Sequence, residues 1–419
     1  METQKRWHLF QRFGIELEYM IVDRDTLDIK PIADQLLQDA DGKPTDEFNN
    51  GPVTWSNELV LHVVEFKCTE PTSDLFQLLQ DLKANIAYAN LLLEKYNARL
   101  LGTAAHPWMD PARETKLWPM GNAEIYETYD RIFNCKGHGW ANLQSMHINL
   151  PFYDDEEFAQ LHAAIRVILP LLPALAASSP ILDQKPSGVL DTRMIYYQKN
   201  QQAIPEITGR VIPENVKSKR LYHKKIYDKI AAAVAPHDPK KILDPIWLNS
   251  RGCIARFDRG AIEIRILDIQ EAPAMDLAIA VFIIHLLKLL TQQKLSDFHT
   301  QGQWAIEPLF EILQSTIEKG PDAQINNKEY LKTLGINDEA AKAKDVIANL
   351  VEQVALQYPR QMEPWLPHLR RMIALGPLSS RILKVANNEY GRGNLRLIYG
   401  ELAENLAENK MFEPWSEPL

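Results

Sequence analysis

The segment FGIELEYMIV at residues 13–22 alternates apolar with polar or small side chains, which is the pattern of a half-buried β-strand. Its apolar series is Ile15, Leu17, Tyr19 and Ile21. Glu16 and Glu18 therefore point together away from the core, about 7 Å apart on one face. Two such carboxylates need a cation nearby to stay ionised. A solvated outer face is the simpler interpretation of a single pair. Whether the pair belongs to a functional site depends on the residues of the other strands.

The chain has 419 residues and enough apolar content to bury the core of a globular protein. It carries 46 basic and 55 acidic residues, a formal charge of -9, with no block of lysine or arginine. A polyanion-binding surface needs a basic stripe, so nucleic acid is not an expected partner.

Three cysteines, Cys68, Cys135 and Cys253, lie far apart with no CxxC pair. This favours reduced thiols over a disulfide framework or a structural zinc site, and hence a cytoplasmic protein. The N-terminal residues lack the apolar segment of a secretory signal. Two apolar stretches, 161–182 and 274–290, are interrupted by proline or by polar side chains, so we expect buried helices and no membrane span.

Three further segments have strand character: Glu58 to Lys67, Arg99 to Ala105 and Ala261 to Ile269. Residues 143–152 alternate as cleanly as the first strand, with His147 on the polar side. Polar loops are expected at 39–52 and 183–213.

Helical spacing is found in three parts of the chain. A helix from the Asp74 cap to about Asn97 follows the second strand, another occupies 154–180, and a basic helical segment ends near Ala235. Almost everything after Met275 has the pattern of helices, whereas residues 109–140 give no firm assignment. We therefore expect an α+β fold with a helical carboxyl-terminal third.

Strands distant in sequence share one design, an aliphatic face and an opposite face with ionisable groups. The ionisable groups are Glu16 and Glu18 on the strand at 13–22, His147 on the strand at 143–152, and Glu263 and Arg265 on the strand at 261–269. A curved antiparallel sheet with helices packed on one face leaves the other free for an active site. Separately, each group has a simpler interpretation, namely a solvated face, a satisfied strand histidine or an exposed ion pair. The joint pattern favours a site.

Glu58 and Glu65 add two acids but are seven residues apart. A regular strand would put them on opposite faces, so both serve one site only if Glu58 precedes the strand or a bulge intervenes. Cys135 with His138 forms an isolated CxxH without a second half, which does not predict a metal site.

Several carboxylates with a single imidazole suit Mg²⁺ or Mn²⁺ better than zinc. Magnesium commonly completes its shell with substrate phosphates, which points to a nucleotide. Arg265 would offer a planar fork to a phosphate or carboxylate. The sequence has no P-loop, GxGxxG, HExxH, GxSxG or kinase signature, so any ATP is bound without a P-loop.

The ordered motifs of residues 13–270 resemble those of the bacterial glutamate–cysteine ligase and carboxylate–amine ligase family, which has the glutamine-synthetase-type fold. The motifs are GIELEYMIVD, ELVLHVVEFKCTEP, SMHINLPF, LPALAASSPI and GAIEIRILD. No single motif is specific, but their order and spacing are. Many carboxylate–amine ligases have a C-G-x-H-x-H stretch at this point, whereas this chain has one histidine, His147. In this respect the chain is closer to the cysteine ligases.

The resemblance implies ATP, two or three Mg²⁺ ions and a γ-glutamyl phosphate that an amine such as cysteine attacks. By position, the implied metal ligands are Glu16, Glu18, Glu58, Glu65, His147 and Glu263. Arg265 is the implied phosphate-binding arginine, with Glu263 beside it in catalysis. Weaker candidates to bind the carboxylates of glutamate are Arg193, Arg256 and Arg259, and Arg193 is also a candidate to bind the cofactor.

We thus expect a catalytic sheet domain at residues 1–275 and a helical region at 276–419 packed on it. The predicted function is an ATP-dependent ligase acting on small molecules, with the acceptor amine and the oligomeric state left open. Two alternatives are a metal-dependent hydrolase on the same acidic sheet, which needs no ATP, and a catalytically silent nucleotide-binding protein.

Overall fold

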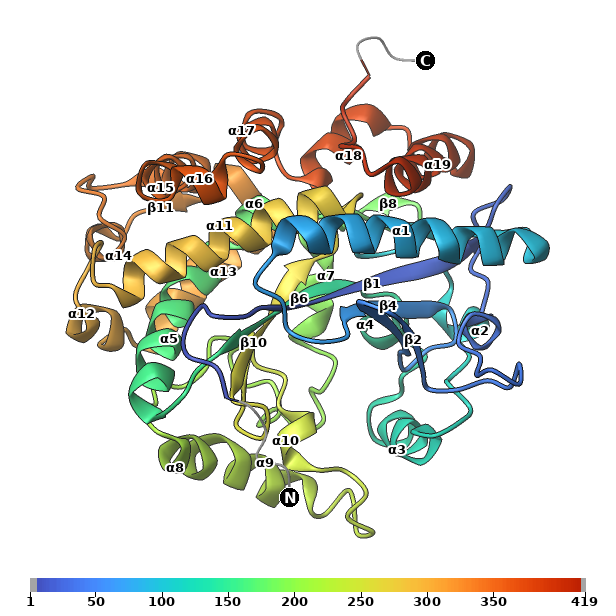
Figure 1. The fold of residues 1–419 in the computed structure, drawn as a ribbon, viewed down its shortest axis with the longest axis horizontal. Coiled ribbons are helices and arrows are strands. Elements are labelled where there is room, and N and C mark those ends of the chain that lie inside the picture. The colour runs from blue at the N-terminus through green and yellow to red at the C-terminus, as the bar shows by residue number, and fades with distance from the viewer. Residues whose placement is uncertain (1–5, 416–419) are drawn as a thin grey trace.

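A computed structural model describes residues 6–415 and centres on one antiparallel sheet (Figure 1). The strands follow the order β2-β3-β4-β1-β6-β10-β9, and β5 also pairs with β1. They are β1 Gly14–Asp23, β2 Glu47–Asn50, β3 Val53–Asn57, β4 Val63–Cys68, β5 Ala98–Leu101, β6 Ser145–Pro151, β9 Cys253–Arg256 and β10 Ala261–Asp268.

The central strand β1 sets the register of its neighbours. Glu16 pairs with Lys67 of β4 and with His147 of β6, and Glu18 pairs with Glu65. The aliphatic residues between these acids are fully buried, with Leu17 at 0 % exposure. Alternation along the strands therefore separates a packed face from a face that collects ionisable groups.

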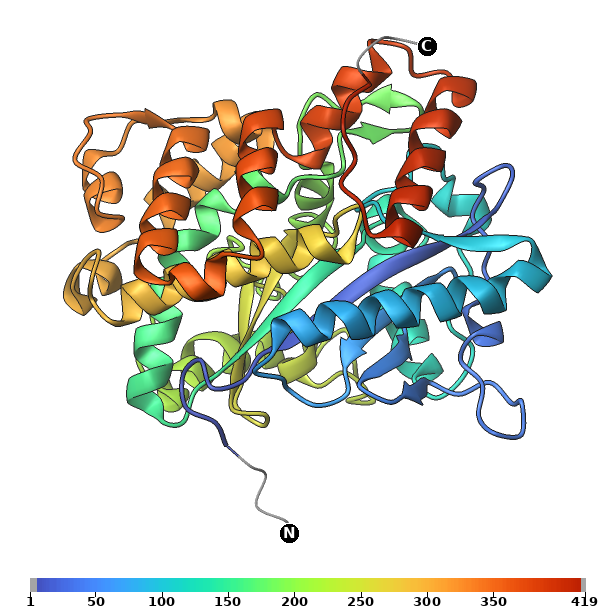
Figure 2. The ribbon, with the colours of Figure 1, turned by 45° about the horizontal axis from the view of Figure 1, so that its top comes forward.

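Two long helices, α1 (Leu75–Leu93) and α11 (Pro273–Thr291), lie along the packed face of the sheet and contact each other (Figures 1 and 2). Helix α1 begins at Asp74, whose carboxylate accepts hydrogen bonds from the amides of Phe76 and Gln77. By length and composition alone, α11 is apolar enough to cross a membrane. However, 83 % of that apolar stretch is buried inside the protein, as expected of a core helix.

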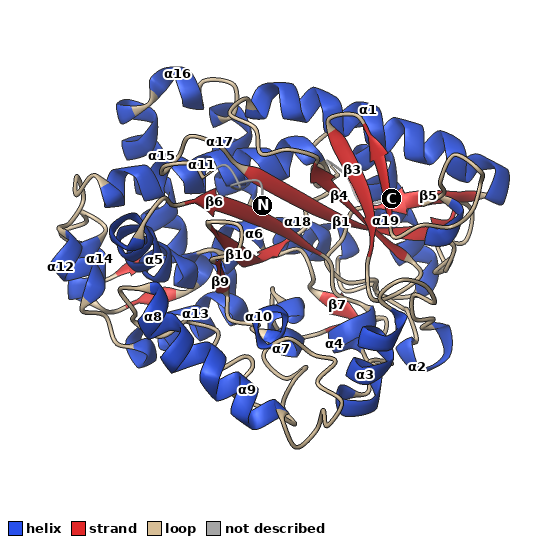
Figure 3. Ribbon diagram, turned by 60° about the horizontal axis from the view of Figure 1, so that its bottom comes forward, coloured by secondary structure: helices blue, strands red, loops and turns tan. Residues whose placement is uncertain are grey.

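The remaining α-helices form two groups. One group consists of α5, α6 and the helices of the carboxyl-terminal third. Most of these lie around α11, whereas α19 contacts α1 and β5. The members are α5 Asp155–Ile168, α6 Pro173–Ala176, α12 Phe298–Gly302, α13 Ile306–Lys319, α14 Lys328–Thr333, α15 Ala343–Gln357, α16 Pro359–Met362, α17 Leu366–Leu375, α18 Leu378–Ala386 and α19 Arg392–Glu408. The others surround the open face (Figure 3): α2 Pro111–Glu114, α3 Ala123–Phe133, α4 His138–Ala141, α7 Thr192–Tyr197, α8 Lys219–Tyr222, α9 Asp228–Val234 and α10 Pro245–Leu248. Two further sheets have two strands each, β7 Ile181–Leu182 with β8 Lys185–Pro186 and β11 Gln324–Ile325 with β12 Ala341–Lys342.

The predicted fold class is confirmed, because an antiparallel sheet carries helices on one face and the carboxyl-terminal third is helical. Strands expected from alternation at 13–22, 143–152 and 261–269 are β1, β6 and β10. The helices expected after Asp74 and at 154–180 are α1 and the proline-interrupted series α5 to α6. The proposed boundary at residue 275 stays a prediction, and α11 shares one hydrophobic core with the sheet.

Three local predictions are wrong. Residues 39–52 are not all loop, because β2 pairs with β3 there. The strand expected over Glu58–Lys67 begins only at Val63, since a turn precedes it, and β3 ends at Asn57. The loop expected at 183–213 contains α7, which begins after Asp191, whose carboxylate accepts a hydrogen bond from the Met194 amide.

Candidate active site

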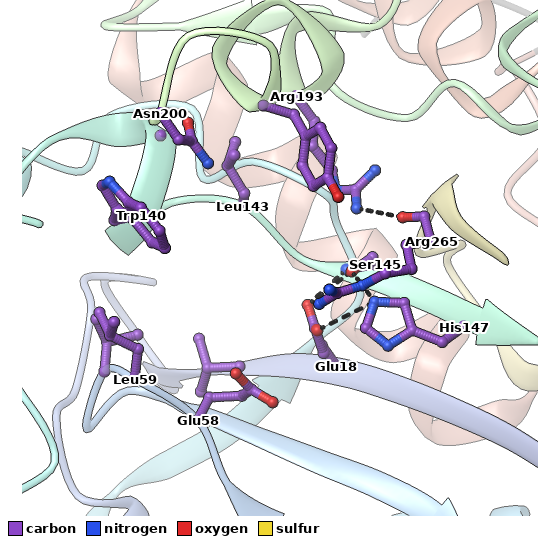
Figure 4. A pocket seen from close by; sticks show the side chains of 14 residues that line it. Glu18, Glu58, Leu59, Trp140, Leu143, Ser145, His147, Arg193, Asn200 and Arg265 are labelled. Atoms are coloured by element: carbon purple, nitrogen blue, oxygen red, sulfur yellow. Dashed lines mark hydrogen bonds and ion pairs between the residues drawn. The ribbon is translucent and has the colours of Figure 1, made fainter. Parts of the chain in front are cut away.

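His147 lies at the centre of the ionisable groups on the open face. Its Nδ1 is 2.9 Å from a carboxylate oxygen of Glu16 and 3.7 Å from one of Glu263. Its Nε2 is 2.9 Å from the Ser145 hydroxyl and 3.8 Å from Glu18. Glu18 also accepts a hydrogen bond of 2.7 Å from the Ser145 amide. The predicted convergence of Glu16, Glu18, His147 and Glu263 is therefore observed, and Figure 4 shows Glu18 beside His147.

A β-bulge places Arg265 beside these acids. Ile264 pairs with Ile148 and Leu267 with Met146, so Arg265 and Ile266 together oppose His147. Ile266 turns into the core, and the Arg265 Nε lies 3.0 Å from a Glu263 carboxylate oxygen. Although burial of the guanidinium opposes it, the charge of Glu263 raises the pKa of Arg265. Arg265 is thus cationic and aimed at the same surface as the carboxylates.

Glu58 reaches the site from the turn between β3 and β4. This resolves the spacing problem, because Glu58 precedes its strand instead of sharing the pleat of β4 with Glu65. Glu58 lines the same cavities as Glu18, His147 and Arg265. Burial, together with the charges of Glu18 and Glu65, raises the pKa of Glu58 well above its ordinary value.

The ionisable side chains of the open face lie close together, and their pKa values shift in different directions. Despite burial, the hydrogen bond and charge of His147 lower the pKa of Glu16 to about 2. Burial of the ring opposes protonation of His147, but its bond to Glu16 and the charge of Glu18 raise its pKa. Burial and the charge of Glu16 raise the pKa of Glu65 to about 7, against the opposing charge of Lys67. The positive side chains of the open face therefore neutralise the negative charge of its glutamates only in part.

This donor set fits divalent cations. Ligand atoms of Glu16, His147 and Glu263 lie within 4.8 Å of one another, and so do those of Glu18, Glu65 and His147. Carboxylate oxygens with one imidazole are suited to Mg²⁺ or Mn²⁺. A cation bound beside Glu18, Glu58 and Glu65 would also oppose the burial and the like charges that raise the pKa values of Glu58 and Glu65.

Arg193, predicted to contact the cofactor, is held against the protein. It is buried on α7, its Nη2 donates a hydrogen bond of 2.8 Å to the Arg265 carbonyl, and its Nη1 is 3.5 Å from the Asp268 carboxylate. It lines the site near Arg265. These contacts favour a role in holding the backbone of the Arg265 bulge.

Two adjoining cavities of about 150 and 210 Å³ meet at a shared boundary of Glu18, Glu58, His147 and Arg265. We call the larger one the charged cavity. Lys67, Trp247, Arg256 and Arg259 line it, and Arg256 stacks on the Trp247 ring with its guanidinium carbon 3.9 Å from the ring centre. Arg256 is also 3.7 Å from Glu263.

Sequence reasoning missed Lys67 and Trp247 as site residues. Lys67 had a signal, since it lies two residues after Glu65 and therefore shares its face. Trp247 had none, because α10 is a helix of four residues whose position depends on the rest of the fold.

Two solved ligases share the fold of this chain. A Francisella tularensis glutamate–cysteine ligase, determined in complex with AMP, superimposes with a TM-score of 0.61 and 13% identity over 96% of this chain and 90% of that one. A bifunctional glutathione synthetase from Pasteurella multocida gives a TM-score of 0.63 and 12% identity over 96% of this chain and 53% of that one. The fold is that of this class of ligases.

The chain belongs to glutamate–cysteine ligase family 2 (GCS2), whose family model matches residues 12–400. An uncharacterized protein of Archaeoglobus fulgidus is 32% identical over 81% of this chain and 93% of its own length. A Rubrobacter xylanophilus protein named "Putative glutamate--cysteine ligase 2-3" is 27% identical over 43% of this chain and 46% of its own length. The resemblance seen in residues 13–270 is therefore confirmed and extends into the carboxyl-terminal third.

Proposed function

We propose that this protein is an ATP-dependent carboxylate–amine ligase that activates a carboxylate, with the γ-carboxylate of glutamate as first candidate, as an acyl phosphate and joins it to an amine. Family membership supports a ligase of the glutamate–cysteine ligase type. The observation that carries the proposal is the position of Arg265 and His147 on the boundary between two cavities, inside a ring of five glutamates. Phosphoryl transfer to a carboxylate needs positioning and charge neutralisation rather than a nucleophilic side chain.

Two groups of side chains would hold the cations. Glu16, His147 and Glu263 form one group, and Glu18, Glu65 and His147 form the other, with Glu58 beside it in the same cavities. Bound Mg²⁺ or Mn²⁺ would neutralise phosphate oxygens. Ser145 and Asn149 fix this arrangement, since they donate hydrogen bonds to Glu18 and Glu16 respectively.

Arg265 is the group that we propose stabilises the transferring phosphoryl group, with Glu263 orienting it. Its guanidinium can bind two phosphate oxygens at once. Arg193 keeps the bulge in place through the Arg265 carbonyl. The protein thus presents a fixed cation where negative charge shifts from ATP to the carboxylate.

We place the nucleotide in the charged cavity. It contains Lys67, Arg256 and Arg259 beside the first cation group, together with Trp247, a residue that is 55 % exposed. The related fold from Francisella tularensis was solved with AMP, which supports an adenine nucleotide as ligand. The reaction would take place in the cytoplasm, in keeping with three cysteines that are free in the described chain.

A hydroxylamine trap tests the proposal. Purified protein is incubated with ATP, Mg²⁺, hydroxylamine and one of a panel of carboxylic acids that includes glutamate, and both ADP and hydroxamate are measured. We expect ADP and hydroxamate in equal amounts, and neither without metal. Hydrolysis of phosphate esters without ATP would support the metal-dependent hydrolase, and binding of Mg²⁺-ATP without ADP release would support the catalytically silent nucleotide-binding protein.

A further inference from the structure

The cavity of about 150 Å³ on the other side of the shared boundary has two unlike ends, and we call it the acceptor cavity. One end is formed by Glu18, His147, Arg193 and Arg265. The apolar side chains Leu59, Trp140 and Leu143 lie away from Glu18 and His147 (Figure 4), and Val60 and Val63 also line the cavity. The cavity therefore changes from ionic to apolar along its length.

The cations of this cavity are already engaged. Arg193 and Arg265 are the only lysine or arginine side chains among its described lining residues. Arg193 contacts Asp268 and the Arg265 carbonyl, and Arg265 is 3.0 Å from Glu263. A second carboxylate on a ligand at the apolar end would be desolvated with no free lysine or arginine among the described lining residues to neutralise it, which is costly.

Trp140 forms a fixed wall at the apolar end. Its ring is packed from behind by Tyr129 and Phe133 of α3, with ring centres 5.4 and 5.7 Å away. Next to it, Gly139 allows the Asn200 side chain to approach, since a Cβ at position 139 would lie 2.2 Å from the Asn200 oxygen. Within the described chain, that oxygen and the Trp140 Nε1 have no hydrogen-bond partner. The end is thus shaped for an apolar group with at most neutral polar substituents.

We infer that the acceptor is a primary amine with an uncharged aromatic or alkyl body and not an α-amino acid such as cysteine, an inference that rests on the proposed ligase function. The amine nitrogen would form the new C–N bond with the acyl carbon. The bond between that carbon and the phosphate oxygen breaks, and phosphate leaves with its electron pair. The surplus proton of the nitrogen passes to solvent.

Two pairs of amines that differ only by a carboxylate test this inference. They are cysteamine against cysteine, and phenethylamine against phenylalanine. ADP release is measured with the acid that gives most hydroxamate, at saturating Mg²⁺-ATP. We expect kcat/KM at least about ten-fold higher for the amine without the carboxylate in each pair, and highest for phenethylamine.

Two variants locate the effect in the cavity. Trp140→Ala should raise the KM for phenethylamine about ten-fold or more and that for hydroxylamine much less, because only the larger amine uses the apolar wall. Leu143→Lys should reduce or reverse the preference against phenylalanine by supplying a cation. Leu356→Lys, at a leucine 78 % exposed on α15, is the matched control and should keep the wild-type preference. Melting curves verify that each variant is folded.

The outcomes separate this inference from the proposed function. Strong ADP release with cysteine and phenylalanine but weak release with their decarboxylated forms would overturn the inference and leave the ligase intact. An unchanged amine preference in folded Trp140→Ala and Leu143→Lys would also overturn it. No ADP release with any acceptor, hydroxylamine included, would overturn the ligase function and the inference with it.

Discussion

The two faces of the sheet use the same strands for opposite purposes. On the packed face, side chains such as Leu17 and Ile148 are fully buried under α1 and α11. On the open face, their immediate neighbours Glu16 and His147 crowd together as ionisable groups. Adjacent residues of one strand therefore differ in role, because one packs in the core and the next contributes an ionisable group to the site. Substitutions on the two faces should have separable effects.

The largest effect on stability is expected on the packed face. Leu17→Ala should lower the free energy of unfolding by about 2–5 kcal/mol, because it opens a cavity in a close-packed core. The enzyme that stays folded should retain its KM values. Denaturant titration measures the first quantity and steady-state kinetics the second. A large loss of stability in Glu18→Gln, equal to that of Leu17→Ala, would argue against separate roles for the two faces.

The largest effect on turnover is expected on the open face. Arg265→Lys keeps the charge but loses the planar fork, which should cost on the order of 2–4 kcal/mol of transition-state stabilisation, or about 10²–10³ in turnover, with little change in melting temperature. ADP release and a melting curve on the same variant measure both. Near-normal turnover would remove Arg265 from the mechanism.

The open face should also make stability depend on pH in the absence of metal. The folded-state pKa of Glu65 is raised to about 7 from an ordinary 4.5, so folded protein keeps a proton that unfolded protein has lost. Stability should consequently fall as pH rises from about 4.5 to 7, by up to ~3 kcal/mol from this residue. Thermal melts across this range with EDTA should show the loss, which Glu65→Gln should reduce. Added Mg²⁺ should restore stability in wild type, and no pH-dependent difference between wild type and Glu65→Gln would contradict the assignment.

A smaller effect on metal use is expected at the centre of the site. His147→Ala should weaken Mn²⁺ binding about ten-fold or more, since the imidazole belongs to both ligand groups, while the core residues Met146 and Ile148 keep the strand in place. Titration of Mn²⁺ against nucleotide binding checks this. Equal metal dependence in wild type and variant would make His147 an ordinary strand histidine.

The smallest effect is expected for an ion pair remote from both faces. Arg370 donates two hydrogen bonds of 2.8 Å to Glu352, but both side chains are about half exposed. Arg370→Lys should cost at most ~1 kcal/mol of stability and leave turnover unchanged. It is the matched control for Arg265→Lys, because the same substitution is made in an ion pair that lines neither the charged cavity nor the acceptor cavity. A comparable loss of turnover in both variants would mean that the assay reports general destabilisation.

Alternation predicted the parts of the fold that depend on local pattern. The parity of β1, β6 and β10 was sufficient to place Glu16, Glu18, His147 and Glu263 on one face, and the Asp74 cap marked the start of α1. Such patterns are specified by the pleat and by the capping geometry of the segment itself.

The remaining parts depend on contacts that no local pattern encodes. β9 has only four residues and is defined by its pairing with β10. The bulge at Arg265 exists only against His147. Helix α7 places Arg193 against the Arg265 carbonyl, although the surrounding residues 183–213 resemble a polar loop. The walls of the acceptor cavity come from short elements, including α4 and α7, whose positions are set by tertiary packing.

The central claim is that the open face transfers a phosphoryl group from ATP to a carboxylate. Its most direct test uses glutamate labelled with ¹⁸O in the γ-carboxylate, together with ATP, Mg²⁺ and an accepted amine. An acyl phosphate intermediate predicts one ¹⁸O atom in each inorganic phosphate released, as measured by mass spectrometry, with ADP as the other product. Unlabelled phosphate, or label found in AMP, would contradict the account.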